Sequence, residues 1–192
     1  LSKSTKMIVD QVAALKAMVD EFQQYARLPS ANPVTIKLDE ILIEFLQMYS
    51  SDGRIKFLNK LQGINSLVEF DRDQLLQVLH NLLQNAQDAI MDKSDGKIMI
   101  ICETIEKKPN PRVSLVIEDN GLGINESILP KIFEPYTTTK FQGTGLGLAI
   151  VKKIVKENNA QISLNNKKDE SGKISGVTAK IEFLNIRKTK RM

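Results

Sequence analysis

Residues 77–90 read QVLHNLLQNAQDAI, and this stretch decides how the rest of the chain is interpreted. Apolar side chains recur at three- and four-residue steps from position 75 to position 90, which predicts a helix with one face in the core. Asn81 and Asn85 lie four residues apart and therefore share a face of that helix. Asparagine is a poor helix former, so a pair of them suggests a purpose such as facing Mg2+ with amide oxygens. Two solvated amides on an exposed face would explain the pair equally well.

A second polar motif follows an apolar strand, where residues 117–124 read IEDNGLGI. The Asp119 carboxylate can accept a hydrogen bond from an exocyclic amine such as that of adenine. Gly121 and Gly123 let the backbone approach a flat ring or turn sharply. A common turn of the Asp-Asn-Gly type would account for the same residues.

A third motif, GTGLGLAI at residues 143–150, leads directly into an apolar helix. The free amides at a helix N-terminus, together with the helix dipole, bind phosphate, and glycines keep side chains out of the way. The motif is not a P-loop, because no Gly-Lys-Ser/Thr follows its glycines, and it does not lie in a βαβ unit. Taken alone, this glycine pattern has little specificity.

Around these motifs, strands and helices mix without regular βαβ alternation. The loop at 107–111 predicts a hairpin, and the long irregular stretch at 119–145 is typical of a functional segment. The pattern predicts an α+β fold, a two-layer arrangement in which helices cover one face of a mixed sheet. We expect helices at about 39–49, 71–91 and 146–158, and strands near 34–36, 55–57, 66–70, 97–105, 112–118, 160–165 and 176–184.

The first 28 residues predict a long N-terminal helix. Its apolar stripe includes Ile8, Leu15 and Phe22, which are spaced by sevens as in a helical hairpin or coiled coil. We expect the stripe to pack against another helix or another chain. The prolines in the segment 28–33 end the helix and mark the domain boundary. The expected division is 1–29, 30–186 and a basic tail at 187–192.

Composition narrows the classes of function. The single cysteine, Cys102, cannot form an internal disulfide and lies in an apolar run, so a buried core position is favoured over a reactive thiol. The net charge of +4 is concentrated in the C-terminal tail and aromatic residues are only 5%, so we expect no nucleic-acid partner. Neither a signal peptide nor a spanning segment is expected in this chain, which begins at Leu1 and so is interpreted as part of a longer protein.

Taken in order, the motifs resemble the four boxes of the GHKL ATPase superfamily, named for gyrase, Hsp90, histidine kinases and MutL. Residues 80–89 resemble its N box, 119–124 its G1 box, 132–136 its F box and 143–147 its G2 box. The strand at 176–183 resembles the one that closes the fold, and the likeness extends over about residues 34–185. The F box, followed by TTTK at 137–140, is similar to the sensor histidine kinase branch, and residues 18–29 resemble the end of the second dimerisation helix of NtrY-like nitrogen-regulation kinases.

This resemblance implies the Bergerat ATP-binding fold and the cofactors ATP and Mg2+. It implies that Asn85 holds the metal, that Asn81 assists at the phosphates, and that Asp119 binds the adenine amine. A mobile lid at about 125–144 would carry Thr138 and Lys140 to the phosphates, which makes Asn81, Asn85 and Lys140 the expected catalytic residues. The remaining expected nucleotide-binding residues are Asp88, Ala89, Gly121, Gly123, Ile124, Gly143, Thr144, Gly145, Leu146, Gly147, Leu148 and Thr178.

The resemblance also implies an ATP-dependent protein-histidine kinase, because hydrolysing relatives have a glutamate where this chain has Asn81, and asparagine cannot act as a general base at neutral pH. His80, the only histidine, lies within the nucleotide helix, so the phosphoacceptor is expected upstream of Leu1. The implied partners are a response regulator and dimerisation helices of its own kind, and the implied location is the cytoplasmic part of a membrane-anchored sensor. A conformational ATPase and a binding module without turnover remain the alternatives.

Overall fold

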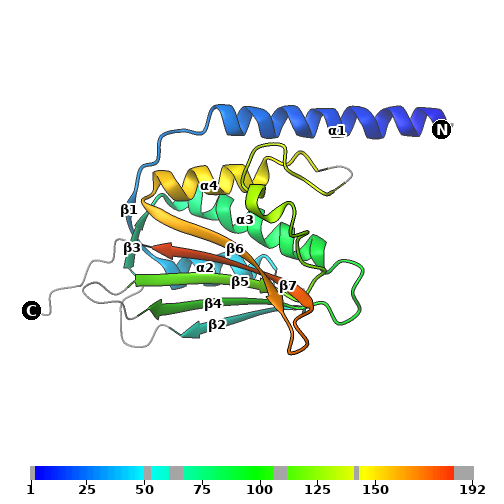
Figure 1. Ribbon diagram of the computed structural model, residues 1–192. Helices are drawn as coiled ribbons and strands as arrows, with labels where there is room; N and C mark the ends of the chain where they lie inside the picture. The colour runs from blue at the N-terminus through cyan, green and yellow to red at the C-terminus, as the bar shows by residue number, and fades with distance from the viewer. Residues whose placement is uncertain (1–2, 50–52, 61–66, 106–111, 141–142, 184–192) are drawn as a thin grey trace, which may run out of the picture.

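The computed structural model describes all of the chain except residues 1–2, 50–52, 61–66, 106–111, 141–142 and 184–192 (Figure 1). The expected hairpin loop at 107–111 and the basic tail at 187–192 lie outside the described residues. The helices are α1 (Lys3–Ala26), α2 (Leu38–Gln47), α3 (Arg72–Ala89) and α4 (Gly147–Glu157), with a short 3-10 turn, η1 (Leu129–Lys131). The strands are β1 (Val34–Lys37), β2 (Ile55–Lys60), β3 (Leu67–Phe70), β4 (Ile98–Ile105), β5 (Arg112–Asp119), β6 (Ala160–Lys168) and β7 (Ile174–Phe183).

A five-stranded sheet in the order β2-β4-β5-β7-β6 forms the main layer. β2 runs parallel to β4, and the other neighbours are antiparallel, so the sheet is mixed as predicted. Strands β1 and β3 do not join it and form a separate antiparallel ribbon in which Val34 is opposite Phe70. The α+β class and the mixed sheet are therefore confirmed.

Helices α2, α3 and α4 pack on one face of the sheet around a single hydrophobic core. The core-facing strand residues alternate, as Ile98, Ile100 and Cys102 do in β4, because side chains on one face of a strand recur every second residue. In Figure 1, α3 and α4 lie side by side above the strands. Burial raises the pKa of the Cys102 thiol to about 12, so it stays protonated and inert, as expected of a core cysteine.

A buried polar network fixes the segment that follows α1. Asn158, at the end of α4, donates to the Gln74 side chain at 2.7 Å and accepts from the Asp71 amide at 2.8 Å. The Gln74 side-chain amide then donates to the Pro29 carbonyl, and the Asn32 amide donates to the Asp71 carboxylate. Buried polar groups of this kind are stable only when paired. The linker is thereby tied to the first turn of α3 and to the last turn of α4.

Helix α1 touches the domain mainly at its C-terminal end. The Lys153 ammonium, on α4, donates to the Tyr25 carbonyl at 3.2 Å and lies over the Tyr25 ring. The sevens-spaced residues Ile8, Leu15 and Phe22 remain 49–62% exposed. Within the described part of the chain, no helix is both long and apolar enough to cross a bilayer.

Candidate functional site

The helix α3 carries the two asparagines toward the lid. Asp71 caps its N-terminus by accepting hydrogen bonds from the amides of Asp73 and Gln74, so the register of the helix is fixed at its start. Asn81 donates from its side-chain amide to the Gln77 carbonyl one turn earlier at 2.9 Å, and its side-chain oxygen lies against the first turn of α4. The two asparagines are partly buried, while the apolar residues of the opposite face form the core.

Asp119 is buried at the end of β5, where it is only 6% exposed. Its Oδ1 accepts hydrogen bonds from the amides of Gly121 at 2.8 Å and Val177 at 3.2 Å. Burial raises the pKa of Asp119, and the two amides with nearby Lys167 and Lys93 oppose that shift without cancelling it. Within the described residues Oδ2 accepts no hydrogen bond, so one oxygen of a rigidly held carboxylate is available to a ligand.

Close backbone approaches surround Asp119. A Cβ atom at Gly121 would lie 2.5 Å from the Ala89 carbonyl oxygen, which places the end of α3 directly against the loop after β5. A Cβ atom at Gly176 would collide with the Asp119 carbonyl oxygen, and Gly176 has a φ of +141°. Thr178 follows Val177 on β7 and is paired with Glu118, so its side chain leaves the sheet on the face opposite to Asp119. The expected position of Thr178 beside the adenine carboxylate is therefore not found, and the amide of Val177 is the β7 group that contacts Asp119. Glycine is required where these backbones meet.

The loop after Asp119 is held by a residue from β6. Gly123 has a φ of +78°, and its α-carbon packs so closely on Ile174 that any side chain would clash. The Ile124 amide donates to the Asn166 side-chain oxygen, and the Asn166 side-chain amide donates to the Ile124 carbonyl, both at 2.7 Å. The Asn166 side chain thus pairs with the Ile124 backbone as a neighbouring strand would, and holds the chain just before the segment expected to form the lid, residues 125–144.

The lid returns on itself through a turn that contains Thr138, Lys140 and Gly143. The Thr138 hydroxyl accepts from the Lys140 amide at 3.0 Å, and the Gly143 amide donates to the Lys140 carbonyl at 3.1 Å. At the base, the Tyr136 amide donates to the Gly145 carbonyl at 3.0 Å. Gly145 has a φ of +71°, and a Cβ there would lie 2.5 Å from the Tyr136 backbone. The lid base is therefore closed tightly before α4 begins.

Helix α4 starts against the first asparagine of α3. A Cβ atom at Gly147 would lie 2.9 Å from the Asn81 side-chain oxygen, so the first turn of α4 and the middle of α3 are in contact. The Thr144 hydroxyl accepts from the Leu146 amide at 3.2 Å. The Leu146 side chain is fully buried and Leu148 packs on the core, so these two residues offer a ligand chiefly their backbone.

The lid also reaches α3 through Lys140. Its ammonium donates to the Asn85 side-chain oxygen at 2.8 Å and to the Asp88 carboxylate at 2.5 Å. Together with the Ala89–Gly121, Asn81–Gly147 and Asp119–Val177 approaches, this contact brings all the segments that the sequence singled out to one edge of the domain. The motif segments at 80–89, 119–124 and 143–147 and the turn that carries Lys140 are therefore neighbours in space.

Three residues at this edge escaped the sequence reasoning. Asn166 holds the Ile124 backbone, and the Lys93 ammonium donates to the Asn120 carbonyl at 2.5 Å. Gln84 donates to the Asp88 carboxylate at 2.8 Å, a contact between residues four apart that helical spacing could have revealed. The other two contacts join segments distant in sequence and leave no local signal.

His80 makes its side-chain contact with Tyr49, just beyond the end of α2. Its Nδ1 lies 3.1 Å from the Tyr49 hydroxyl oxygen, and the ring is exposed. It lines a hollow of about 600 Å³ under the α1–β1 linker, together with Arg27, Asn81 and other residues of α3 and α4. Asn81 and Gln84 belong both to this hollow and to the edge described above.

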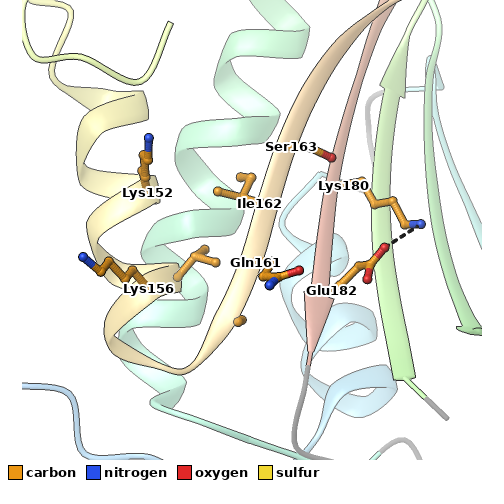
Figure 2. Close-up of a pocket in the computed structure, with 9 residues that line it drawn as sticks. Lys152, Lys156, Gln161, Ile162, Ser163, Lys180 and Glu182 are labelled. Carbon is orange, nitrogen blue, oxygen red and sulfur yellow. Dashed lines mark ion pairs between the residues drawn. The ribbon is translucent and has the colours of Figure 1, made fainter. Parts of the chain in front are cut away.

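A second hollow lies away from the cluster, along the outer edge of β6. Its volume is about 360 Å³. Figure 2 shows the residues that line it, which come from α4, where Lys152 and Lys156 lie, and from the strands β6 and β7. Lys180 and Glu182 pair at 3.0 Å on β7. None of the residues expected to bind nucleotide lines this hollow.

Known proteins share this arrangement. The family model described as "Histidine kinase-, DNA gyrase B-, and HSP90-like ATPase" matches residues 70–185. An NtrY-like sensor histidine kinase of Rickettsia conorii is 32% identical over 190 residues, which cover 97% of this chain and 30% of that protein. The chain spans less than half the length of the curated relatives that it matches, between 23% and 45%.

Solved structures give the same assignment. The catalytic domain of the histidine kinase ThkA matches with a TM-score of 0.64 at 32% identity, covering 79% of this chain and 95% of that one. ThkA in complex with the response regulator protein TrrA matches with a TM-score of 0.70 at 27% identity, covering 95% of this chain and 50% of that one. These matches confirm the resemblance to the GHKL superfamily and to NtrY-like kinases. The chain belongs to the family of histidine kinase-, DNA gyrase B- and HSP90-like ATPases.

Proposed function

We propose that this chain is the ATP-binding catalytic part of a two-component sensor histidine kinase. It would transfer the γ-phosphoryl group of ATP to a histidine outside residues 1–192, from which a response regulator receives it. The observation that carries the proposal is the buried Asp119 carboxylate with one oxygen held by two amides and the other free, at an edge where Asn81, Asn85 and the lid converge. The solved complex of ThkA with TrrA supports the response regulator as the final acceptor.

Asp119 is suited to select adenine. Its free Oδ2 can accept a hydrogen bond from an exocyclic amine, and Gly121 and Gly123 leave room for a flat ring beside it. The backbone of residues 143–148, at the start of α4, would then meet the phosphates, since its first-turn amides have no partners inside the helix.

The residues at the phosphate end fit a magnesium ion. The Asn85 side-chain oxygen already faces a cation, the Lys140 ammonium, at 2.8 Å, so its lone pairs point to where positive charge is held. Oxygen donors of this kind are what Mg2+ takes in proteins, with phosphates and water completing its shell. When bound, the metal would neutralise charge on the β- and γ-phosphates.

Transfer to a side chain is favoured over hydrolysis by what the site lacks. Asn81 cannot take a proton from water at neutral pH, whereas a glutamate could. The lid, closed at its base by Tyr136 and Gly145, would exclude water while Thr138 and Lys140 contact the phosphates. Catalysis would rest on positioning and on charge neutralisation of the transferred group.

The N-terminal helix would be the end of a dimerisation and phosphotransfer helix, comprising residues 1–29, followed by the catalytic domain at 30–186. Its apolar stripe is uncovered in the single chain, with Ile8 61% and Leu15 62% exposed, which is the face that a helix of a second copy would bury. The histidine that accepts phosphate would precede Leu1. A membrane anchor, if the parent sensor has one, would also lie outside this chain, and the chain itself would work in the cytoplasm.

Calorimetric titration with ADP and with a non-hydrolysable ATP analogue, with and without Mg2+, tests the proposal. We expect magnesium-dependent binding that is weakened in Asn85→Ala and abolished in Asp119→Ala, with no phosphohistidine formed from labelled ATP by the chain alone. A folded sample that binds no nucleotide would refute the proposal. Sustained release of phosphate from ATP would instead favour a conformational ATPase.

A further inference from the structure

The lid lysine and two residues of α3 form a compact cation-binding arrangement. The Lys140 ammonium lies 2.8 Å from the Asn85 oxygen and 2.5 Å from Asp88 Oδ2, so the two oxygens converge on one point. Asn85 and Asp88 are three residues apart and share a face of α3. The other oxygen of the carboxylate, Asp88 Oδ1, accepts from Gln84 at 2.8 Å, which orients Oδ2 toward the same point.

The contact between Lys140 and α3 includes an ion pair, because Asp88 is negatively charged and Lys140 positively charged. Asp88 is 35% exposed and Lys140 is 46% exposed, so the pair is open to solvent and can exchange partners. A carboxylate oxygen and an amide oxygen together are hard donors suited to Mg2+. Within the described part of the chain, no cluster of three or more histidine, cysteine or carboxylate residues is placed to hold a metal, and Asn85 and Asp88 supply two oxygen donors. A metal held by Asn85 and Asp88 would therefore complete its shell from phosphates and water.

We propose that Asp88 is the second protein ligand of the metal, beside Asn85, and that Lys140 occupies the metal position in the nucleotide-free chain. The inference rests on the proposed function for the role of the metal, but the competition between Lys140 and a divalent cation does not require nucleotide. When ATP arrives, its phosphates compete for the Lys140 ammonium and release the two oxygens. Metal and nucleotide therefore bind together, while the free chain does not take up the metal.

Removal of Lys140 gives the direct test. Lys140→Met keeps an unbranched side chain one atom shorter and removes its charge, and Lys131→Met in η1 is a matched control for charge loss within the lid. Binding of Mn2+ is measured by electron paramagnetic resonance on nucleotide-free protein. We expect no saturable Mn2+ binding in the wild-type chain or in Lys131→Met, and one saturable site per chain in Lys140→Met. Circular dichroism and thermal unfolding confirm that each variant is folded.

A second variant assigns the ligands. Asp88→Asn in the Lys140→Met background keeps an oxygen for Gln84 but removes the negative charge, and we expect it to abolish the new Mn2+ site. Failure of the folded Lys140→Met variant to gain Mn2+ would overturn the inference, and so would an Mn2+ site that survives Asp88→Asn. Gain of the site in a chain that binds no nucleotide would leave this inference standing and remove the proposed function instead.

Discussion

Replacing Asp119 with asparagine changes one atom that matters. Oδ1 is held by the amides of Gly121 and Val177, and both need an acceptor, so the asparagine oxygen takes that position. The side-chain NH2 then replaces Oδ2 and presents a donor where the carboxylate presented an acceptor. We expect Asp119→Asn to fold normally and to bind adenine nucleotides more weakly.

The size of the loss follows from the bond that is removed. A hydrogen bond to a charged group contributes about 1.5–3 kcal/mol net. At 1.4 kcal/mol per tenfold, the affinity for ADP should fall roughly 10- to 150-fold. Stability should not fall, because burial raises the pKa of Asp119 above that of an unfolded aspartate. Its ionised form is therefore costly at neutral pH, and the neutral amide removes that cost.

Inosine nucleotides distinguish a lost hydrogen bond from general damage. Inosine has a carbonyl where adenosine has the amine, so it accepts from the asparagine NH2 and is repelled by the carboxylate. Calorimetry with ADP and IDP should show that the wild-type chain prefers ADP and that Asp119→Asn reverses the preference. Asp92→Asn, at an exposed position, is the control and should retain the wild-type ratio. Equal losses for both nucleotides, or no loss for ADP, would refute the role given to Asp119.

Three further predictions concern the same fold. Acidification should weaken ADP binding, because protonated Asp119 no longer offers a charged acceptor. The pKa of Asp119 is raised by burial, so the loss should begin above the ordinary aspartate pKa of about 3.9. Titrations with ADP over a pH series measure this, with Asp119→Asn as the variant whose affinity should not depend on this carboxyl group. Asn158→Ala should destabilise the chain by about 2–6 kcal/mol in urea unfolding, since it leaves the Asp71 amide and the Gln74 oxygen unpaired, and a loss below 1 kcal/mol would contradict the network. Gly176→Ala should lower the melting temperature and the ADP affinity together, because a Cβ there displaces the Asp119 carbonyl; an unchanged affinity would show that the pocket tolerates the shift.

Local patterns predicted the helices α3 and α4 well. The expected helix at 71–91 is observed at Arg72–Ala89, and the one at 146–158 at Gly147–Glu157. Both have strong apolar periodicity, and Asp71 supplies a side-chain cap whose position can be read from the sequence. Local signals of this type depend only on neighbours within one or two turns, so they survive without knowledge of the tertiary fold.

Strand pairing could not be predicted in the same way. The parallel alignment of Ile55 with Ile98, and the separation of β1 and β3 into their own ribbon, depend on how the chain crosses between layers. A strand shows which of its faces is apolar but does not show its neighbour. The same reason explains why Asn166 and Lys93 were missed at the site, although Asp119, which they flank, was found from its own motif.

The linker network gives the molecule a mechanical property. Segment 27–33 is short. Just before it, Tyr25 at the end of α1 is held by Lys153 of α4, and within it Pro29 and Asn32 are hydrogen-bonded to the start of α3. Because the linker is short and hydrogen-bonded, it would absorb little of a rotation of α1. The rotation would instead be passed to α3, the helix that carries Asn81 and Asn85. Its contacts with the lid and with α4 would then change.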